Sequence, residues 1–401
     1  MLFGAIADDY TGGSDLAGML AERGVRTLMH FGVPEAPMIG SYDAAVVCLK
    51  SRSIAAEAAR TMSARALAWL QAAGARQIHF KYCSTFDSTS AGNIGPVLDE
   101  LLDRLKVPFS VVVPALPVNG RTQYLGHLFV NGVLLAESPM RHHPLNPMTD
   151  SNLVRHLAAQ TPSRVGLIPL PVVQRGPEAI ERHAAQLIAE GTCMALVDAV
   201  AESDLAQIAE AFVDAPLISG GSGIAAHLPA FWHVESPILS PRPLEAGPPG
   251  VLMLAGSCSA ATLDQLDRYQ RAFGPALRFD AAADAAATLE RTGRALIYSS
   301  APPDRRLPLS SAGLIEQTLA RIAAGMVNSQ RVRRIIVAGG ETSGAVVDAL
   351  GIKAVEVLRV LSPGVPALRT LGADPIALVL KSGNFGSPDF FAEAAAYLET
   401  L

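Results

Sequence analysis

Short apolar runs alternate along this chain with longer stretches that have helical spacing. Five runs are predicted as strands: YDAAVVCLK (42–50), RQIHFKY (76–82), PFSVVVPAL (108–116), RVGLIPL (164–170) and MALVDA (194–199). Residues 55–74 and 94–106, between such runs, have the spacing of helices. Continuous rather than alternating hydrophobicity is typical of strands that helices cover on both faces. The order therefore predicts an α/β fold with mostly parallel sheets flanked by helices.

A proline-dense segment, ESPILSPRPLEAGPPG (235–250), interrupts this order, and the apolar run VLMLAG restarts it. A chain of 401 residues is also long enough for two α/β domains. We predict a first domain at 1–240 and a second at 247–401, each a mostly parallel sheet flanked by helices.

The first domain contains an irregular, hairpin-containing excursion at 119–152. The segment GHLFVNGVLL predicts a hairpin that turns at Asn131-Gly132. An excursion of this length more often forms a lid or a site wall than a linker. Its two adjacent histidines, His142 and His143, have no third ligand at suitable spacing, so we expect loop contacts and no metal site.

Composition excludes several classes of protein. The net charge is −5 and no block of Lys and Arg occurs, which argues against a nucleic-acid partner. The four cysteines form no CxxC pair, as expected for reduced thiols. No apolar run is long enough to span a bilayer, and an acid pair follows the first short apolar run. We expect a cytoplasmic protein without a membrane partner.

Five strands run into glycine-rich turns that open helices, at 4–20, 216–228, 251–266, 334–351 and 376–394. A helix N-terminus offers unpaired N–H groups, and glycine allows an anion to approach the backbone closely. Each turn alone could be a simple helix cap. Three of them in the second domain together predict a site for nucleotide phosphates. Neither GxxxxGK[ST] nor GxGxxG with a suitable acid occurs, which argues against a P-loop kinase and a Rossmann dehydrogenase.

The first domain has different chemistry at its strand ends. Asp8 and Asp9 end the first apolar run. The segment 80–95 carries Lys81, Asp87, Ser88, Thr89 and Asn93. This set suits a polyhydroxylated acid, because acceptors hold hydroxyls, cations hold a carboxylate, and one carboxylate can accept a proton. The competing interpretations are a turn cap for Asp87 and a solvated strand end for Lys81. Arg121 and Arg141 are candidate clamps for an anionic substrate.

Taken together, these stretches resemble the four-carbon acid sugar kinase family. The matching stretches are ADDYTGGSDLAG, KYCSTFDST with GNIGP, NGRTQYLGHLFV, MRHHPLNPMTDSNLVR, GGSG, GSCS, GGETSGAVV, SPGVP and LKSGNFG, in order along nearly the whole chain. The middle stretches are most similar to the 3-oxo-tetronate kinase branch rather than to threonate or erythronate kinases. Departures from the family pattern occur at Tyr10, Gly13-Ser14, Ala260 and Ser362.

The resemblance implies a two-domain kinase that uses ATP and Mg²⁺ and phosphorylates the 4-hydroxyl of a four-carbon acid sugar. The expected sugar-binding residues are Asp8, Asp9, Lys81, Asp87, Ser88 and Arg121, and one of Asp8, Asp9 and Asp87 is the expected base. The expected nucleotide-binding residues are Ser257, Gly339, Gly340, Glu341, Thr342, Ser362, Pro363, Gly364, Val365, Gly383 and Asn384. A kinase of D-threonate or D-erythronate, a non-enzymatic acid-sugar sensor and an oxidoreductase are the alternatives. A small molecule is the expected partner, and homo-oligomerisation is left open.

Overall fold

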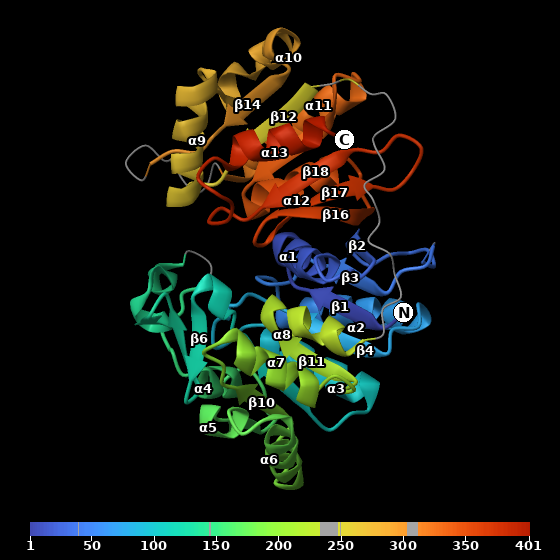
Figure 1. Cartoon of the computed structure of the whole chain (residues 1–401), viewed down its shortest axis with the longest axis vertical. Helices are drawn as coiled ribbons and strands as arrows, with labels where there is room; N and C mark the ends of the chain where they lie inside the picture. The colour runs from blue at the N-terminus through green and yellow to red at the C-terminus, as the bar shows by residue number, and fades with distance from the viewer. Residues whose placement is uncertain (39, 144–145, 233–247, 249, 303–311) are drawn as a thin grey trace. The chain divides into compact units, whose positions relative to one another are not determined.

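The structure is a computed structural model that describes residues 1–38, 40–143, 146–232, 248, 250–302 and 312–401. The chain divides into two compact units, Met1–Ser236 and Pro237–Leu401, which are described separately (Figure 1). The proline-dense segment 235–250 lies almost entirely outside the described residues. The domain limits at 240 and 247 therefore stay a prediction.

The first unit is built on a parallel sheet with the strand order β2-β3-β1-β4-β11-β5-β10-β9. Its strands are β1 (Phe3–Ala7), β2 (Thr27–Phe31), β3 (Ala44–Cys48), β4 (Gln77–Lys81), β5 (Ser110–Val113), β9 (Val165–Ile168), β10 (Met194–Val197) and β11 (Leu217–Gly220). The five apolar runs that we predicted as strands form β3, β4, β5, β9 and β10, so both the strands and their parallel pairing are confirmed.

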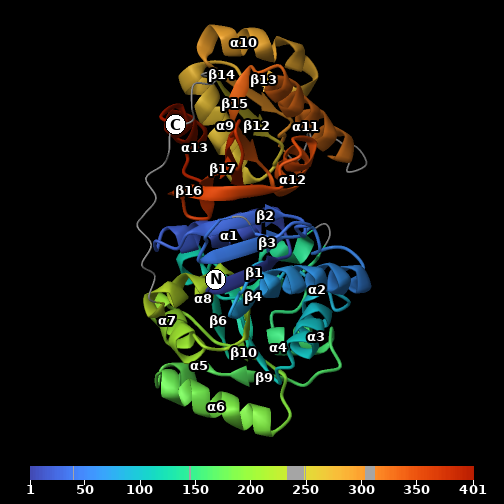
Figure 2. The same cartoon turned by 90° about the vertical axis from the view of Figure 1, so that its right-hand side faces the viewer.

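Helices cover both faces of this sheet (Figure 2). One set, whose members contact one another in turn, is α1 (Tyr10–Ala21), α8 (Ser222–His227), α7 (Glu202–Ala211), α6 (Pro177–Ala189) and α5 (Leu170–Val173). The other set is α2 (Ala56–Ala72), α3 (Ile94–Leu105) and α4 (Leu153–Ala158). Short 3₁₀ helices are η1 (Pro117–Asn119), η2 (Leu135–Glu137), η3 (Pro139–His142) and η4 (Leu228–Phe231). The helices predicted at 55–74 and 94–106 are confirmed as α2 and α3.

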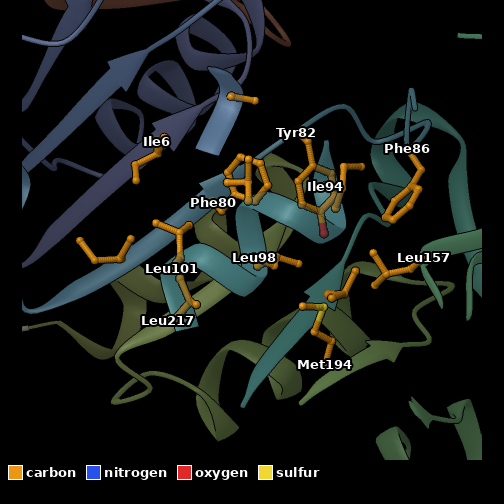
Figure 3. Packing of buried hydrophobic residues seen from close by; sticks show 14 of the residues in the cluster. Ile6, Phe80, Tyr82, Phe86, Ile94, Leu98, Leu101, Leu157, Met194 and Leu217 are labelled. Carbon is orange, nitrogen blue, oxygen red and sulfur yellow. The ribbon is translucent and has the colours of Figure 1, made fainter. Parts of the chain in front are cut away.

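An aromatic cluster packs between the sheet and α3 (Figure 3). The Tyr82 ring stands edge-on to Phe80 and to Phe86, with centroids 5.3 and 5.4 Å away. On the helix side, Ile94, Leu98 and Leu101 recur at helical spacing and are buried. Close packing on both sides of the chain segment after β4 holds that segment in one conformation.

The excursion forms a small antiparallel sheet of β6 (Arg121–Tyr124), β7 (His127–Val130) and β8 (Val133–Leu134). The predicted turn is confirmed, because Asn131 (φ 52°) and Gly132 (φ 82°) link the paired residues Val130 and Val133. Leu125 and Gly126, with φ of 47° and 73°, form a second turn of this kind between β6 and β7, which the sequence analysis missed.

A buried carboxylate ties this excursion to the main sheet. Asp198, directly after β10, accepts hydrogen bonds from the N–H groups of Leu125 (2.6 Å), Gly126 (2.9 Å) and Leu170 (3.0 Å). The amide of Gln123 donates a fourth, at 3.1 Å. One acid thus satisfies four donors in the two connections that cross this edge of the sheet.

The second unit contains a sheet in the order β13-β14-β12-β15-β18-β17-β16. Its strands are β12 (Gly250–Ala255), β13 (Leu277–Arg278), β14 (Arg294–Tyr298), β15 (Val332–Ala338), β16 (Ala354–Ser362), β17 (Val365–Thr370) and β18 (Ala377–Lys381). Neighbouring strands are parallel except that β17 is antiparallel to both β18 and β16. The predicted mostly parallel sheet is confirmed, and the antiparallel β17 was not foreseen.

Helices flank this second sheet as well. They are α9 (Ala260–Phe273), α10 (Ala285–Thr292), α11 (Ala312–Asn328), α12 (Gly340–Ala349) and α13 (Phe390–Glu399), with the short helix η5 (Phe279–Asp284). α9 contacts α13, and α11 contacts α12. Within the described ranges, no helix of either unit has the length and apolar character needed to cross a membrane.

We predict that Asp198→Ala lowers the free energy of unfolding by about 3 kcal/mol, because three backbone N–H groups lose their acceptor. Urea denaturation measures the change, and Asp214→Ala, at an exposed aspartate, serves as the control. Equal stability of the two variants would contradict the anchoring role of Asp198.

Candidate functional site

In the first unit, the predicted sugar-site residues gather where β1 and β4 end. The two strands are parallel neighbours with Ala7 opposite Lys81, so their ends lie at one edge of the sheet. The N–H of Asp8 donates to the carbonyl of Lys81 at 3.0 Å. Asp8, Asp9 and Lys81 are therefore close together, as predicted.

Arg52, which the sequence analysis missed, joins the three candidate carboxylates. Its guanidinium donates to both oxygens of Asp8, with Nε–Oδ2 and Nη2–Oδ1 each 2.8 Å. Nη2 also lies 2.8 Å from Asp9 Oδ1, and Nη1 lies 3.9 Å from Asp87 Oδ2. A bidentate Arg–carboxylate pair fixes both geometry and charge. The sequence signal that could have identified Arg52 is its place shortly after β3, because β3 is parallel to β1 and ends at the same edge of the sheet.

The loop that carries Arg52 is held by Asn93. The side-chain amide of Asn93 donates to the carbonyls of Ser51 (2.7 Å) and Ile54 (2.9 Å). Asn93 was considered in the sequence as part of the polar set for a sugar. In the structure its amide nitrogen positions the Arg52 loop.

The two adjacent aspartates have different roles. Asp9 is the N-cap of α1, since its Oδ1 accepts from Gly12 N and its Oδ2 from Thr11 Oγ1, both at 2.9 Å. Burial opposes ionisation of Asp9, but Arg52, Lys81 and these hydrogen bonds outweigh it and lower its pKa. For Asp8, burial dominates and raises the pKa although Arg52 opposes the shift. The environments thus move the pKa values of the two carboxyls in opposite directions.

Asp87 lies in the turn after β4 and is 8% exposed. Thr85 donates to its Oδ1 at 2.7 Å, so Asp87 takes part in a local turn, as the competing interpretation expected. Its Oδ2 lies 3.9 Å from Arg52 Nη1. The Asp8 and Asp9 oxygens that contact Arg52 lie closer, at 2.8 Å, so Asp87 Oδ2 is bound least tightly by this cation. The turn role and a role toward a ligand are compatible.

Lys81 and Ser88, two further sugar-site candidates, make hydrogen bonds inside the fold. Lys81 is 3% exposed and its Nζ donates to Tyr82 O at 2.8 Å, so the alternative of a solvated strand end is wrong. The hydroxyl of Ser88 donates to Phe86 O (3.0 Å) and accepts from the Gln160 amide (2.8 Å), so it is engaged inside the fold. A sugar-binding role for Ser88 stays a prediction.

Asp15 is a second residue that the sequence analysis missed. It is 5% exposed, and its Oδ2 accepts from Ser222 Oγ at 2.5 Å. Burial raises its pKa, whereas Lys81 and Arg121 act to lower it, which places both cations near this carboxylate. Arg121 also donates to Asn119 O. The candidate clamp Arg121 is thereby linked to the Lys81 side of the site.

In the second unit, the turns after β12, β15 and β18 meet at one edge, because β15 lies between the other two strands. The N–H groups of Gly256 and Ser257 donate to Ala338 O at 3.0 and 3.1 Å, and Gly339 N donates to Lys381 O at 2.9 Å. Three of the predicted nucleotide segments are thus bonded to one another. Because the Ser257 N–H donates to Ala338 O, the group of Ser257 that could contact a ligand is its hydroxyl.

The start of α12 is open to a ligand. Gly339 (φ 128°) precedes the helix, and no side chain caps it. Within the described chain, the N–H groups of Gly340, Glu341 and Thr342 have no acceptor. Unpaired donors at a helix N-terminus fit the oxygens of a phosphate.

The fourth predicted segment, residues 362–365, is the turn between β16 and β17. Ser362 pairs with Val365, and Pro363 with Gly364 (φ 76°) fits a type II turn. The pairing of Ala367 with Val379, continued by two residues, places Val365 opposite Lys381. This segment therefore lies at the same edge as the other three.

Lys381 ends β18 and was not among the predicted residues. Its side chain is fully buried, and burial lowers its pKa to about 7. It stands two residues before Gly383, in the stretch that was predicted as a glycine-rich turn (376–394) and matched as the family motif LKSGNFG.

Among the described residues, no group of three or more His, Cys, Asp and Glu side chains could hold a metal ion. His143 Nδ1 accepts from Asn146 N at 3.1 Å, in keeping with the loop contacts that we expected.

Comparisons with known proteins agree with this division of chemistry. A family model described as "Sugar-binding N-terminal domain" matches residues 3–228, and one described as "Nucleotide-binding C-terminal domain" matches residues 252–391. A 3-oxo-tetronate kinase of Cupriavidus necator is 48% identical, covering 99% of this chain and 97% of that protein. One of Haemophilus influenzae is 40% identical, covering 98% and 99%.

Solved structures are similar over the same length. The crystal structure of a Haemophilus influenzae protein has a TM-score of 0.82 at 39% identity and covers 98% of this chain and all (100%) of that one. A Salmonella typhimurium structure described as a putative tRNA synthase has a TM-score of 0.87 at 39% identity and covers 98% of both chains.

We predict that Arg52→Gln lowers the free energy of unfolding at pH 7 by about 3–5 kcal/mol, because it leaves buried carboxylates unpaired. Without Arg52, the native pKa of Asp8 rises further above its unfolded value. The native state then binds more protons than the unfolded state, so the deficit should shrink as the pH falls from 7 to 5. Urea denaturation at the two pH values tests this, with Arg182→Gln, at an exposed arginine, as control. A deficit that is independent of pH would contradict it.

Proposed function

The chain belongs to the four-carbon acid sugar kinase family, and from this premise we propose that it phosphorylates the 4-hydroxyl of 3-oxo-tetronate with ATP. Relatives of that name, at 40–48% identity, extend over nearly the whole chain and support this substrate. The family is ATP-dependent, and the two family matches divide the chain into a sugar-binding and a nucleotide-binding part.

The observation that carries the proposal is the contrast between the two sheet edges. The edge of the second unit presents glycine turns and the unpaired N–H groups at the start of α12, which suit phosphates. The edge of the first unit presents carboxylates held by the half-buried Arg52 beside the buried Lys81, which suits a hydroxylated acid. A sensor of acid sugars would need only the carboxylates and cations of the first unit. A kinase also needs the phosphate-binding groups of the second unit.

On the nucleotide side, the α12 N–H groups and the Ser257 hydroxyl would bind phosphate oxygens. Mg²⁺ supplies charge neutralisation on the phosphates in such reactions. Because Mg²⁺ in phosphoryl-transfer sites is bound largely by the substrate phosphates, we propose that it binds here chiefly through ATP. The chain's own contribution is positioning, which is the main demand of phosphoryl transfer.

On the sugar side, we propose Asp87 as the group that accepts the 4-hydroxyl proton. Asp9 is committed to the helix cap, and both oxygens of Asp8 bind Arg52. Asp87 Oδ2 has only the longer contact with Arg52, so it can receive a hydroxyl hydrogen bond. Lys81 and Arg121 are the cations proposed for the substrate carboxylate.

We predict that purified protein with ATP and Mg²⁺ releases ADP when 3-oxo-tetronate is added, and at least about tenfold more slowly with D-threonate or D-erythronate. A coupled ADP assay over this panel measures it. If D-threonate or D-erythronate were turned over faster than 3-oxo-tetronate, that acid would be assigned as the substrate instead. Binding of an acid without ADP release would favour the sensor and overturn the kinase.

Single-turnover rates of three variants test the base. We predict that Asp87→Asn lowers the phosphoryl-transfer rate by about 10²–10⁴-fold, the usual range for a lost general base. Asp9→Asn should retain most of the rate, because asparagine is also a good N-cap. Thermal unfolding of each variant controls for folding. A wild-type rate in Asp87→Asn with a large loss in Asp8→Asn would move the role to Asp8.

A further inference from the structure

The two units contain the same local frame at their strand ends. In the first, β1 lies between β3 and β4; in the second, β15 lies between β12 and β18. The residues after the central strands align as Ala-x-x-x-Thr-x-Gly, at 7–13 and 338–344. Each frame has a helix starting at this point and a lysine, Lys81 or Lys381, at the end of the next strand.

The backbone hydrogen bonds of the two frames correspond. Leu49 N donates to Ala7 O at 2.7 Å, as Gly256 N donates to Ala338 O at 3.0 Å. The lysine carbonyls accept from the first residue after each central strand, at 3.0 Å for Lys81 and 2.9 Å for Lys381. Both lysine side chains are buried, and each Nζ donates to the carbonyl of the following residue. The lysines therefore hold equivalent places.

Their surroundings differ in charge. Lys81 acts electrostatically on Asp9 and Asp15, so carboxylates lie near it. Around Lys381 Nζ lie the Thr262 hydroxyl, two carbonyls and the ring of Phe390, whose centroid is 5.6 Å away. Burial alone lowers its pKa, and no carboxylate or second cation of the described residues contributes. The ammonium group of Lys381 thus has no anionic partner in the described part of the chain.

The hydrogen bonds of Lys381 orient the turn that follows it. Nζ lies 3.2 Å from Ser382 O and 3.0 Å from Gly383 O. Gly383 O also accepts from Ser259 Oγ (2.6 Å) and Thr262 Oγ1 (2.8 Å), both at the start of α9. Both carbonyls are therefore directed toward the lysine, and that of Gly383 is also directed toward the start of α9.

A planar trans peptide directs its N–H opposite to its carbonyl. The peptides whose carbonyls belong to Ser382 and Gly383 carry the N–H groups of Gly383 and Asn384, which therefore point away from the ammonium group of Lys381. In the described residues neither N–H has an acceptor. Farther along the turn, the Gln265 amide donates to the carbonyls of Phe385 (3.1 Å) and Ser387 (2.9 Å), which extends the same orientation.

We propose that Lys381 is a positioning residue of the nucleotide site, which turns the Gly383 and Asn384 N–H groups toward the ATP phosphates and supplies the positive charge behind them. This inference rests on the proposed function, because ATP is the ligand. Among the described residues, this buried cation has no anion and the two N–H groups have no acceptor, and a bound anion would supply both. Nucleotide affinity should then depend on the protonation of Lys381.

The test compares Lys381→Met with Lys353→Met, which removes an exposed lysine. Calorimetric titration of the full chain with Mg-ATP, without any sugar acid, gives the affinity. We expect the ATP dissociation constant of Lys381→Met to rise at least about tenfold at pH 7, and that of Lys353→Met to stay within about twofold. In turnover assays, KM for ATP should rise while KM for the acid sugar is unchanged.

A pH series provides a readout that a merely structural lysine would not affect. Protonated Lys381 should favour the phosphates, so wild-type affinity for Mg-ATP should fall about tenfold from pH 7 to pH 9, with proton uptake on binding. Lys381→Met should lack this dependence, and the ionisation of ATP itself cancels in the comparison. Unchanged ATP affinity in Lys381→Met, or the same pH profile in both proteins, would overturn the proposal.

ATP binding by a second variant and ADP release by the wild type give two further tests. If Lys381→Met does not fold, Thr262→Val removes a hydroxyl that accepts from Lys381 and donates to Gly383 O, and should raise the ATP dissociation constant several-fold. No change in that variant, with no proton uptake by the wild type, would refute the role. Absence of ADP release with every sugar acid would instead refute the kinase proposal, while ATP binding still tests Lys381.

Discussion

Parallel pairing of strands is the constraint on which the chemistry of this protein depends. Parallel strands end at the same edge of a sheet, so residues far apart in sequence become neighbours without any special contact. Asp8 and Lys81 meet because β1 pairs with β4, and Gly256, Gly339 and Lys381 meet because β12, β15 and β18 are adjacent. Each candidate site follows from the strand order of its own unit.

The two edges share a common backbone frame but differ in charge. Both have a buried lysine at the end of one strand and a helix start after its neighbour. In the first unit the turn carries Asp8 and Asp9, whereas Gly339 and Gly340 take those places in the second. Carboxylates would repel phosphates, and glycines leave the N–H groups accessible to them. A change of two side chains thus separates an acidic edge from one whose N–H groups are accessible.

Charge balance explains how the first unit tolerates so many buried acids. An isolated carboxylate in a protein interior is costly, and pairing with a hydrogen-bonded cation offsets that cost. Arg52 provides this pairing for Asp8 and Asp9, and Asn93 holds the loop that carries it. The candidate site is therefore pre-organised by an arginine that lies on a connection rather than on a strand or a helix.

Sequence alone determined the alternating α/β order, the five strand runs, the Asn131-Gly132 hairpin and the strand ends that carry Asp8, Lys81 and the glycine turns. These features are local, since hydrophobic periodicity and turn chemistry act over a few neighbouring residues. Only the tertiary structure decided that Asp9 is the cap, that Arg52 joins three carboxylates, and that Lys381 is buried with no counter-ion among the described residues. Burial, ion pairing and pKa shifts depend on what packs around a side chain, and that packing brings together residues that are distant in the chain.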